Sequence, residues 1–167
     1  GRAIDVTTLA AKQAGWGKKL PAGHGLGLAF HFSHAAHIAE VAEVSVDKNK
    51  KLTVHRVTVA VDVGPIINRS GALSQVKGSI IDGLSTMVGQ QITMEAGRIE
   101  QSNLHDYPVL RIPAAPEVDV HFIESDNPPT GLGEPGLPPL APAVGNAQVR
   151  DGPAKGLQIA HQRDPSL

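Results

Sequence analysis

The chain has 167 residues, 15 basic and 16 acidic side chains, a formal net charge of −1 and no cysteine. This length fits one domain with a hydrophobic core, and the balanced charge gives no electrostatic case for nucleic acid or an anionic membrane. A chain without cysteine has no disulfides, thiolate metal sites or iron–sulfur ligands of its own.

The sequence contains no apolar run of about 18 residues, the length that a membrane span needs. Its first residues, GRAID, lack an initiator Met and the basic-then-apolar order of a signal peptide, so we expect the chain to begin inside a longer protein. Glycine and proline cluster at 21–27, 126–145 and 151–165, which indicates functional loops.

The first half of the chain predicts one helix and three strands. Apolar spacing over 5–14, followed by Gly15, predicts a helix with Asp5 as a candidate cap. Residues 20–27 are expected to form a turn and 28–32 a short strand. Residues 37–47 and 50–64 alternate in the manner of strands on either side of DKNK, which predicts a hairpin.

The second half predicts a long helix and a further strand. Residues 72–90 carry an apolar helical stripe interrupted by Gly78 and Gly83, two glycines that suggest close approach of another backbone or a ligand. The pattern predicts strand, turn and strand over 91–101, a strand over 117–125, and a helix that could begin within 138–146. The prediction is an α+β fold: a mixed, mostly antiparallel sheet packed against two helices, 5–14 and 72–90.

Glu134 is the one acid in the stretch TGLGEPGLPPLAPAVGNA, residues 130–147. The glycines give this backbone conformational freedom and Pro135 stiffens it, so Glu134 is expected at a rigid tip. In an apolar pocket, desolvation would make this carboxylate a usable general base. A solvated Glu on a proline-rich loop is the alternative, and local chemistry alone favours it.

A resemblance changes that balance. VDVGPIINRSGALSQVKGSIIDGLS (61–85) and QSNLHDYPVLRIPAAPEVDVHFIESDNPPTGLGEPGLPPLAPAVGNA (101–147), with upstream segments from about Ala10, occur in the order seen in molybdenum hydroxylases. The chain resembles the C-terminal part of their molybdopterin-binding large subunit. The family includes xanthine dehydrogenase and aldehyde oxidoreductases, and the likeness is greatest to the branch of isoquinoline 1-oxidoreductase β-subunits.

The resemblance implies a molybdenum-dependent oxidoreductase that hydroxylates an N-heterocycle or oxidises an aldehyde with water-derived oxygen. It implies that Glu134 is the general base next to the metal. It also implies molybdenum–molybdopterin as cofactor, in the cytosine dinucleotide form. The implied partners are the rest of the large subunit and a small [2Fe-2S] ferredoxin-like subunit. The compartment stays open between bacterial cytoplasm and periplasm.

By the same resemblance, Gln75 hydrogen-bonds the pterin, since its amide both donates and accepts. Lys77 stands where the family often has Glu, which weakens any statement about charge near Gln75. Gly64 and Asn68 precede the helix in a loop similar to a cofactor-facing turn, although plain turn chemistry explains them equally well. Gly133 is expected to support the Glu134 loop by its backbone freedom, as is Gly136.

Histidines offer a competing metal site that we do not favour. His31, His34 and His37 form H-x-x-H-x-x-H, which on a helix could gather a metal, but a strand and a loop are expected here. His105 and Tyr107 either line a substrate funnel or pack, and packing is favoured.

The resemblance runs from about Ala10 to Ala147. We expect residues 1–147 to form a C-terminal segment of the molybdopterin-binding domain, and the polar, proline-broken residues 148–167 depart from the family. We expect a poorly ordered tail, and a shifted reading frame near Ala147 would explain the change. Because other cofactor-binding segments are missing from these 167 residues, a truncated, non-catalytic fragment is the alternative to a working enzyme segment.

Overall fold

The computed structural model describes residues 1–148. A four-stranded sheet has the order β1-β2-β3-β6, where β1–β2 and β2–β3 pair antiparallel and β6 runs parallel to β3. The mixed, mostly antiparallel sheet is confirmed. The strands are β1 (His24–Ser33), β2 (Ala36–Val46), β3 (Leu52–Asp62) and β6 (Glu117–Phe122), and a small hairpin pairs β4 (Met94–Glu95) with β5 (Arg98–Ile99). The helices are α1 (Arg2–Ala14), α2 (Arg69–Val88), α3 (Leu140–Gln148) and the short 3₁₀ turn η1 (Ile112–Ala114).

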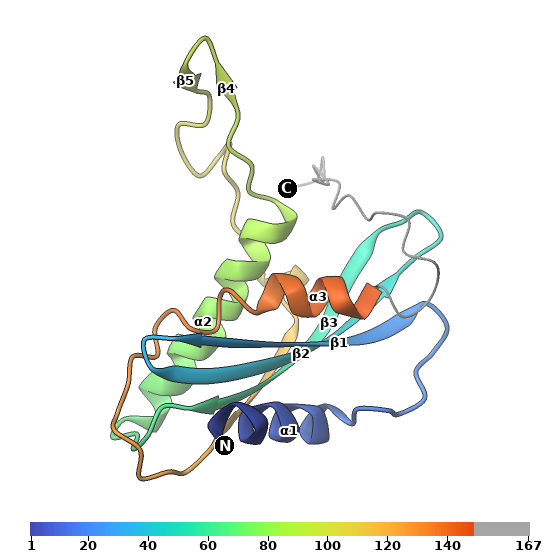
Figure 1. The fold of residues 1–167 in the computed structure, drawn as a ribbon. Coiled ribbons are helices and arrows are strands. Elements are labelled where there is room, and N and C mark those ends of the chain that lie inside the picture. The colour runs from blue at the N-terminus through green and yellow to red at the C-terminus, as the bar shows by residue number, and fades with distance from the viewer. Residues whose placement is uncertain (149–167) are drawn as a thin grey trace.

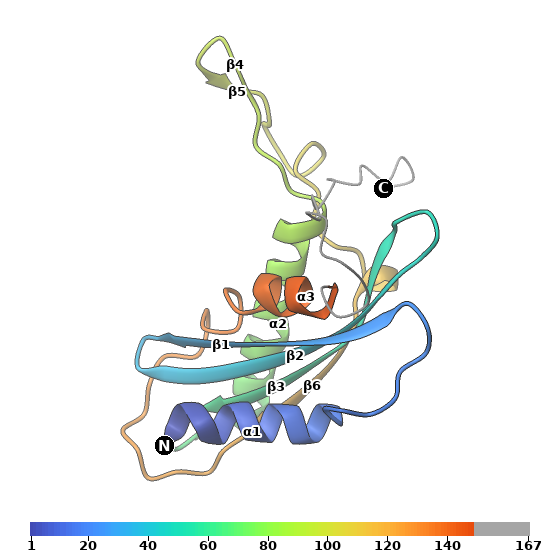
Figure 2. The same cartoon turned by 45° about the vertical axis from the view of Figure 1, so that its right-hand side comes forward.

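Helix α1 covers one face of the sheet (Figures 1 and 2). Val6, Ala10 and Ala14 recur every four residues, so they share one side of α1 and are buried against strand residues such as Val41. Gly15 ends the helix in the left-handed conformation, with φ 69°. The capping prediction was wrong: Gly1 occupies the N-cap and Asp5 lies within the first turn.

Helices α2 and α3 cover the opposite face, so the sheet is the middle layer of three. Because strand side chains alternate, one set of positions on β2 and β3 faces α1 and the next set faces α2 and α3. The larger core lies on this second side and includes Ile38, Val57, Val59, Ile80 and Leu140. The prediction named two helices; α3 is a third, in the region where 138–146 suggested one.

Strand β1 is longer than predicted because α3 lies directly on it. Residues 20–27 were expected to form a turn, but Gly25 and Gly27 belong to β1. A methyl group on Gly27 would overlap the Ala143 carbonyl oxygen and the Ala147 amide nitrogen of α3. The glycines therefore permit close helix-on-strand packing, and Asn146 Nδ2 adds a hydrogen bond of 2.9 Å to the Leu28 carbonyl.

The β4–β5 hairpin ends an arm that extends from the body beyond the last turn of α2 (Figures 1 and 2). This confirms the predicted strand–turn–strand over 91–101. Several large apolar side chains along the arm and at its base are exposed: Ile92, Met94, Ile99, Leu104, Val109 and Ile112.

Within residues 1–148, no helix is long and apolar enough to cross a bilayer. The prediction of a poorly ordered tail falls almost wholly on residues 149–167, which lie outside the described part of the chain.

Candidate functional site

The loop that carries Glu134 is fixed at both ends. The Thr130 amide donates to the Val63 carbonyl at 3.0 Å, and the Leu137 amide donates to the Glu134 carbonyl at 2.9 Å, which closes a tight turn over Pro135. Pro135 fits the second position of such a turn because its φ is already set. Residues 138–140 then lead into α3.

The glycines of this loop act differently from the prediction. Gly133 and Gly136 are absent from the positions with positive φ, so their backbone does not need glycine for its conformation. Space is the constraint at Gly136, whereas a methyl group at Gly133 would make only ordinary van der Waals contact. A methyl group at Gly133 would lie 3.4 Å from Gln75 Oε1, and one at Gly136 would overlap Ser79 Oγ.

The Glu134 loop therefore lies against α2 and next to Gln75. Helix α2 also approaches the start of α3: the position of a methyl group on Gly83 is 3.1 Å from the Leu137 carbonyl oxygen and 3.3 Å from Leu140 Cδ2. The expected close approach is confirmed at Gly83. At Gly78, which is exposed, nothing in residues 1–148 lies within 4 Å of that position, so no backbone of the described chain approaches it and the ligand alternative stays a prediction.

The Glu134 side chain is exposed. The prediction of an apolar pocket around it is not met within residues 1–148, because Pro135, Pro139 and Leu140 are buried beneath the loop instead. The loop presents the carboxylate outward and keeps its apolar residues inward.

Gln75 is also exposed, and its side chain has no hydrogen-bond partner within residues 1–148. Lys77 is exposed two positions further along α2. Residues two apart on a helix do not face each other, so Lys77 points away from the side that carries Gln75. The departure at Lys77 is thus on a different side of α2 from the Gln75 amide.

Gly64 and Asn68 both have structural roles. Gly64 is buried with φ 74°, and a side chain there would overlap the Asn127 carbonyl oxygen. Asn68 is the N-cap of α2: its Oδ1 accepts from the Gly71 amide at 2.9 Å and from Ser70 Oγ at 3.0 Å. These contacts are the turn chemistry that was one of the two interpretations, and cofactor contact by either residue stays a prediction.

Asp62 ties the loop after β6 to the end of β3 and to α1. Its carboxylate accepts hydrogen bonds from Arg2 Nε at 2.6 Å, Ser125 Oγ at 2.7 Å and Asn127 Nδ2 at 3.2 Å. Burial raises the pKa of Asp62, but the hydrogen bonds from Arg2, Ser125 and the Gly64 amide outweigh it and hold that pKa below its usual value. The ionised Asp62 carboxylate therefore anchors the segment that leads to Glu134 through Ser125 and Asn127.

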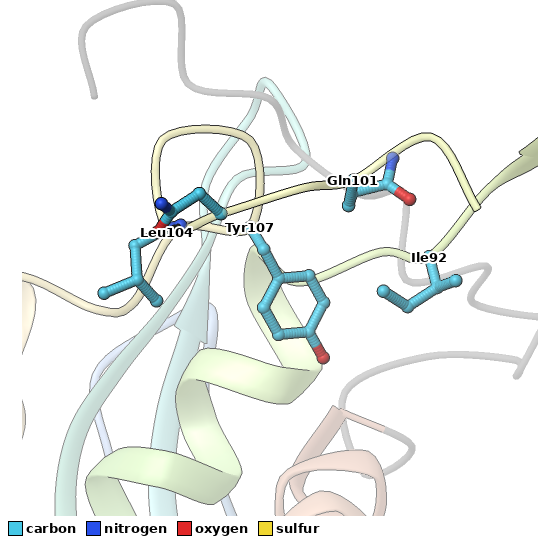
Figure 3. A pocket seen from close by; sticks show the side chains of 5 residues that line it. Ile92, Gln101, Leu104 and Tyr107 are labelled. Carbon is cyan, nitrogen blue, oxygen red and sulfur yellow. Dashed lines mark hydrogen bonds between the residues drawn. The ribbon is translucent and has the colours of Figure 1, made fainter.

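The pocket drawn in Figure 3 lies on the arm, beyond the C-terminal end of α2. It measures about 290 Å³ and is lined by Ile92, Gln101, Asn103, Leu104 and Tyr107. Tyr107 is half-buried there, in line with packing, whereas the side chain of its neighbour His105 is 75% exposed. None of these lining residues belongs to the Glu134 loop or to the part of α2 that it approaches.

Comparison with known proteins decides the family. A family model described as a molybdopterin cofactor-binding domain matches residues 5–116. The chain belongs to the molybdopterin cofactor-binding domain family. It is 36% identical over 153 residues to the beta subunit of isoquinoline 1-oxidoreductase from Brevundimonas diminuta, covering 89% of this chain and 20% of the relative. An alignment covering that share of the chain must include both Gln75 and Glu134.

Other relatives agree with this family. The membrane-bound aldehyde dehydrogenase [pyrroloquinoline-quinone] of Gluconacetobacter polyoxogenes is 33% identical over 156 residues, covering 90% of this chain and 20% of that protein. The crystal structure of quinoline 2-oxidoreductase from Pseudomonas putida 86 has a TM-score of 0.61 at 20% identity, over 67% of this chain and 15% of that one, which shows the shared fold. The chain thus spans about a fifth of the length of the first two relatives.

The residues of this molybdopterin cofactor-binding domain are chemically suited to such a cofactor. Gln75 offers an amide donor and acceptor, and Glu134 offers a carboxylate. Both are exposed and lack hydrogen-bond partners within residues 1–148, and Gly133 brings their elements into contact. The donor set therefore fits a pterin beside a proton acceptor.

The domain also contains an acid that sequence reasoning missed. Glu40 on β2 is 0% exposed, and neither of its carboxylate oxygens has a hydrogen-bond partner among residues 1–148. Burial raises the pKa of Glu40 well above its ordinary value. Its cross-strand neighbours are Ala29 and Val59. The sequence signal for its burial was the run of apolar residues on both sides of it, Ile38, Ala39, Val41 and Ala42, which is typical of a strand covered on both faces.

The three histidines of the H-x-x-H-x-x-H motif are separated by the β1–β2 turn. His31 on β1 pairs with Ile38, His34 lies in the turn with φ 51°, and His37 on β2 pairs with Phe32. Successive pairs along a hairpin alternate faces, so His31 and His37 lie on opposite faces of the sheet. Across residues 1–148, no three His, Asp or Glu side chains are grouped to hold a metal ion.

Proposed function

We propose that this chain forms one wall of the cofactor site in a molybdenum hydroxylase that hydroxylates an N-heterocycle or oxidises an aldehyde. Glu134 would be the general base and Gln75 a pterin ligand. The observation that carries the proposal is the closeness of the Glu134 loop to Gln75 in a domain of the molybdopterin-binding family: a methyl group placed on Gly133 would lie 3.4 Å from Gln75 Oε1.

Each residue has a defined task. The Gln75 amide donates to and accepts from the pterin edge, and the Asn68 cap fixes the start of the helix that carries it. When bound, the molybdenum centre supplies redox chemistry and acidifies water. The Glu134 carboxylate accepts the proton released as water-derived oxygen is transferred to the substrate, and the turn over Pro135 holds that carboxylate in place.

The finer parts of the proposal follow the names of the relatives. Isoquinoline and aldehydes appear in those names, which supports an N-heterocycle or aldehyde substrate. Two relatives, the isoquinoline enzyme and a nicotinate dehydrogenase from Pseudomonas putida, are named as single subunits, which supports a multi-subunit enzyme. We extend this to the rest of the large subunit, a small [2Fe-2S] ferredoxin-like subunit and the cytosine dinucleotide form of the cofactor.

The test compares Glu134→Gln with the parent protein in the assembled enzyme, using isoquinoline and an aldehyde as substrates. Gln is nearly the same shape and cannot accept the proton, so turnover should fall by about 10³-fold or more while molybdenum and pterin content stay unchanged. Gln75→Ala should instead lower the pterin content. Full turnover in Glu134→Gln would overturn the role of Glu134. A parent enzyme that binds neither molybdenum nor pterin would favour the non-catalytic alternative.

A further inference from the structure

Three residues of α2 line the side of the helix that faces the Glu134 loop: Gln75, Ser79 and Gly83. They are spaced four apart, which places them on one side of the helix at intervals of about 6 Å. We call them the loop-facing row. Each meets one part of the chain around Glu134: Gln75 meets Gly133, Ser79 meets Gly136, and Gly83 meets Leu137 and Leu140.

The middle contact is the tightest of the three. Ser79 is 6% exposed, and its hydroxyl donates to the Val76 carbonyl of its own helix at 2.8 Å. That hydrogen bond fixes the Oγ atom against the α-carbon of Gly136, where it occupies the space that any side chain at position 136 would need. Gly136 lies two residues after Glu134, inside the turn that the Leu137 amide closes on the Glu134 carbonyl.

We propose that Ser79 is a positioning residue for Glu134: its hydroxyl, pressed against Gly136, sets the distance between the Glu134 turn and α2. The inference rests on the proposed role of Glu134 as general base. Because Gln75 lies on the same row, the contact also fixes the carboxylate relative to the residue that is proposed to bind the pterin. A shift of the turn by one atomic diameter would move the base relative to the cofactor, and displacements of about 1 Å can cost 10²-fold in rate.

The geometry predicts a specific suppressor. Apart from Ser79 Oγ, the closest atoms to a methyl group at Gly136 are Ile38 Cδ1 and Ser79 Cβ, both at 3.5 Å, which is ordinary van der Waals contact. As long as Ser79 Oγ keeps its hydrogen bond to the Val76 carbonyl, Gly136→Ala alone should therefore push the turn away from α2. Adding Ser79→Ala removes the one overlapping atom, so the double variant should let the turn return.

The experiment measures kcat and KM in the holoenzyme for Gly136→Ala, Ser79→Ala and the double variant. Gly78→Ala is the matched control, because a methyl group there meets nothing within 4 Å on the same helix. Gly136→Ala should lower kcat about tenfold to a hundredfold with KM within about twofold, since the base and not the substrate has moved. Ser79→Ala alone should lower kcat less, and the double variant should recover to the Ser79→Ala value.

Hydrogen exchange of the Leu137 amide gives a readout that does not depend on activity. The amide donates to the Glu134 carbonyl, and this hydrogen bond protects its proton from exchange. The Leu137 amide proton should exchange about tenfold faster in Gly136→Ala and return towards the parent rate in the double variant. A double variant no better than Gly136→Ala in kcat and exchange, or wild-type kcat in Gly136→Ala, would overturn the positioning role. Glu134→Gln in the same series separates the two ideas: if it is inactive while Gly136→Ala is fully active, only the positioning role fails, whereas an active Glu134→Gln refutes the proposed function itself.

Discussion

Replacing Glu40 by Gln should make the stability of the protein less dependent on pH. The Glu40 side chain is 0% exposed, and its carboxylate oxygens have no hydrogen-bond partner in the described part of the chain. The flanking strand residues are Ala29 and Val59. Burial therefore raises the pKa of Glu40 well above the ordinary 4.5. As the pH rises above 4.5, Glu40 therefore keeps its proton in the native protein and loses it in the unfolded chain.

The sign and size of the effect follow from this extra proton. When the native state binds one more proton than the unfolded state, the free energy of unfolding falls by about 1.4 kcal/mol for each unit that the pH rises. The fall begins near the ordinary pKa of Glu40 and ends above its folded-state pKa. Gln cannot ionise, so the stability of Glu40→Gln relative to the parent should rise between pH 5 and pH 6, by at most about 1.2 kcal/mol, the limit for a native Glu40 that stays protonated over this range.

Urea unfolding of both proteins at pH 5, 6 and 7 measures this difference. Glu43→Gln is the control on the same strand. The hydrogen bond from Lys18 lowers the pKa of Glu43, so the contribution of Glu43 to the pH dependence of stability has the opposite sign. If the parent and Glu40→Gln differ in stability by the same amount at pH 5 and pH 6, the native protein does not hold the extra proton and the reasoning fails.

Three further predictions concern packing, charge and capping. Gly27→Ala should cost about 3 kcal/mol or more because its methyl group overlaps the backbone of α3. Gly145→Ala, whose methyl group meets nothing within 4 Å among residues 1–148, should instead stabilise α3 by up to about 1 kcal/mol. Thermal unfolding compares the two variants, and equal midpoints would contradict the close packing. The stabilisation from Asp62 should be complete above its unfolded pKa, which ordinarily is 3.8, and be lost as the pH falls through its lower folded-state pKa, so Asp62→Asn should flatten the acid limb of an unfolding titration. Asn68→Ala should cost about 1 kcal/mol because the cap of α2 is lost, while Asn68→Asp keeps the cap. Lower pterin content in the stable Asn68→Asp variant would reveal cofactor contact, and parent-level content would limit Asn68 to capping.

Periodicity predicted the elements well where burial is one-sided. Residues 5–14 and 72–90 carry apolar stripes at helical spacing, and α1 and α2 lie there, with starts three residues earlier. The β2–β3 hairpin formed about DKNK as predicted. Boundaries were less accurate because they depend on caps: the Asn68 side chain begins α2 before its apolar stripe does.

Glycine misled the sequence reasoning because its two uses look alike in a sequence. Gly25 and Gly27 suggested a turn, and the glycines around Glu134 suggested conformational freedom. In the structure all of these residues have φ values open to other residues. Gly25, Gly27 and Gly136 are needed because another element approaches their α-carbons closely, and that approach depends on segments far away in the chain.

The sequence by itself determined the family, the α+β class and the identity of Glu134 and Gln75 as candidates, because motif order and periodicity are properties of the chain. The tertiary structure alone decided that Gln75 and the Glu134 loop are in contact, although 59 positions apart (75 to 134), and that Ser79 separates the loop from α2. It also decided that Glu40 is buried without a partner while Glu134 is exposed. Burial and contact depend on which faces of distant elements meet, and local residue patterns do not specify that.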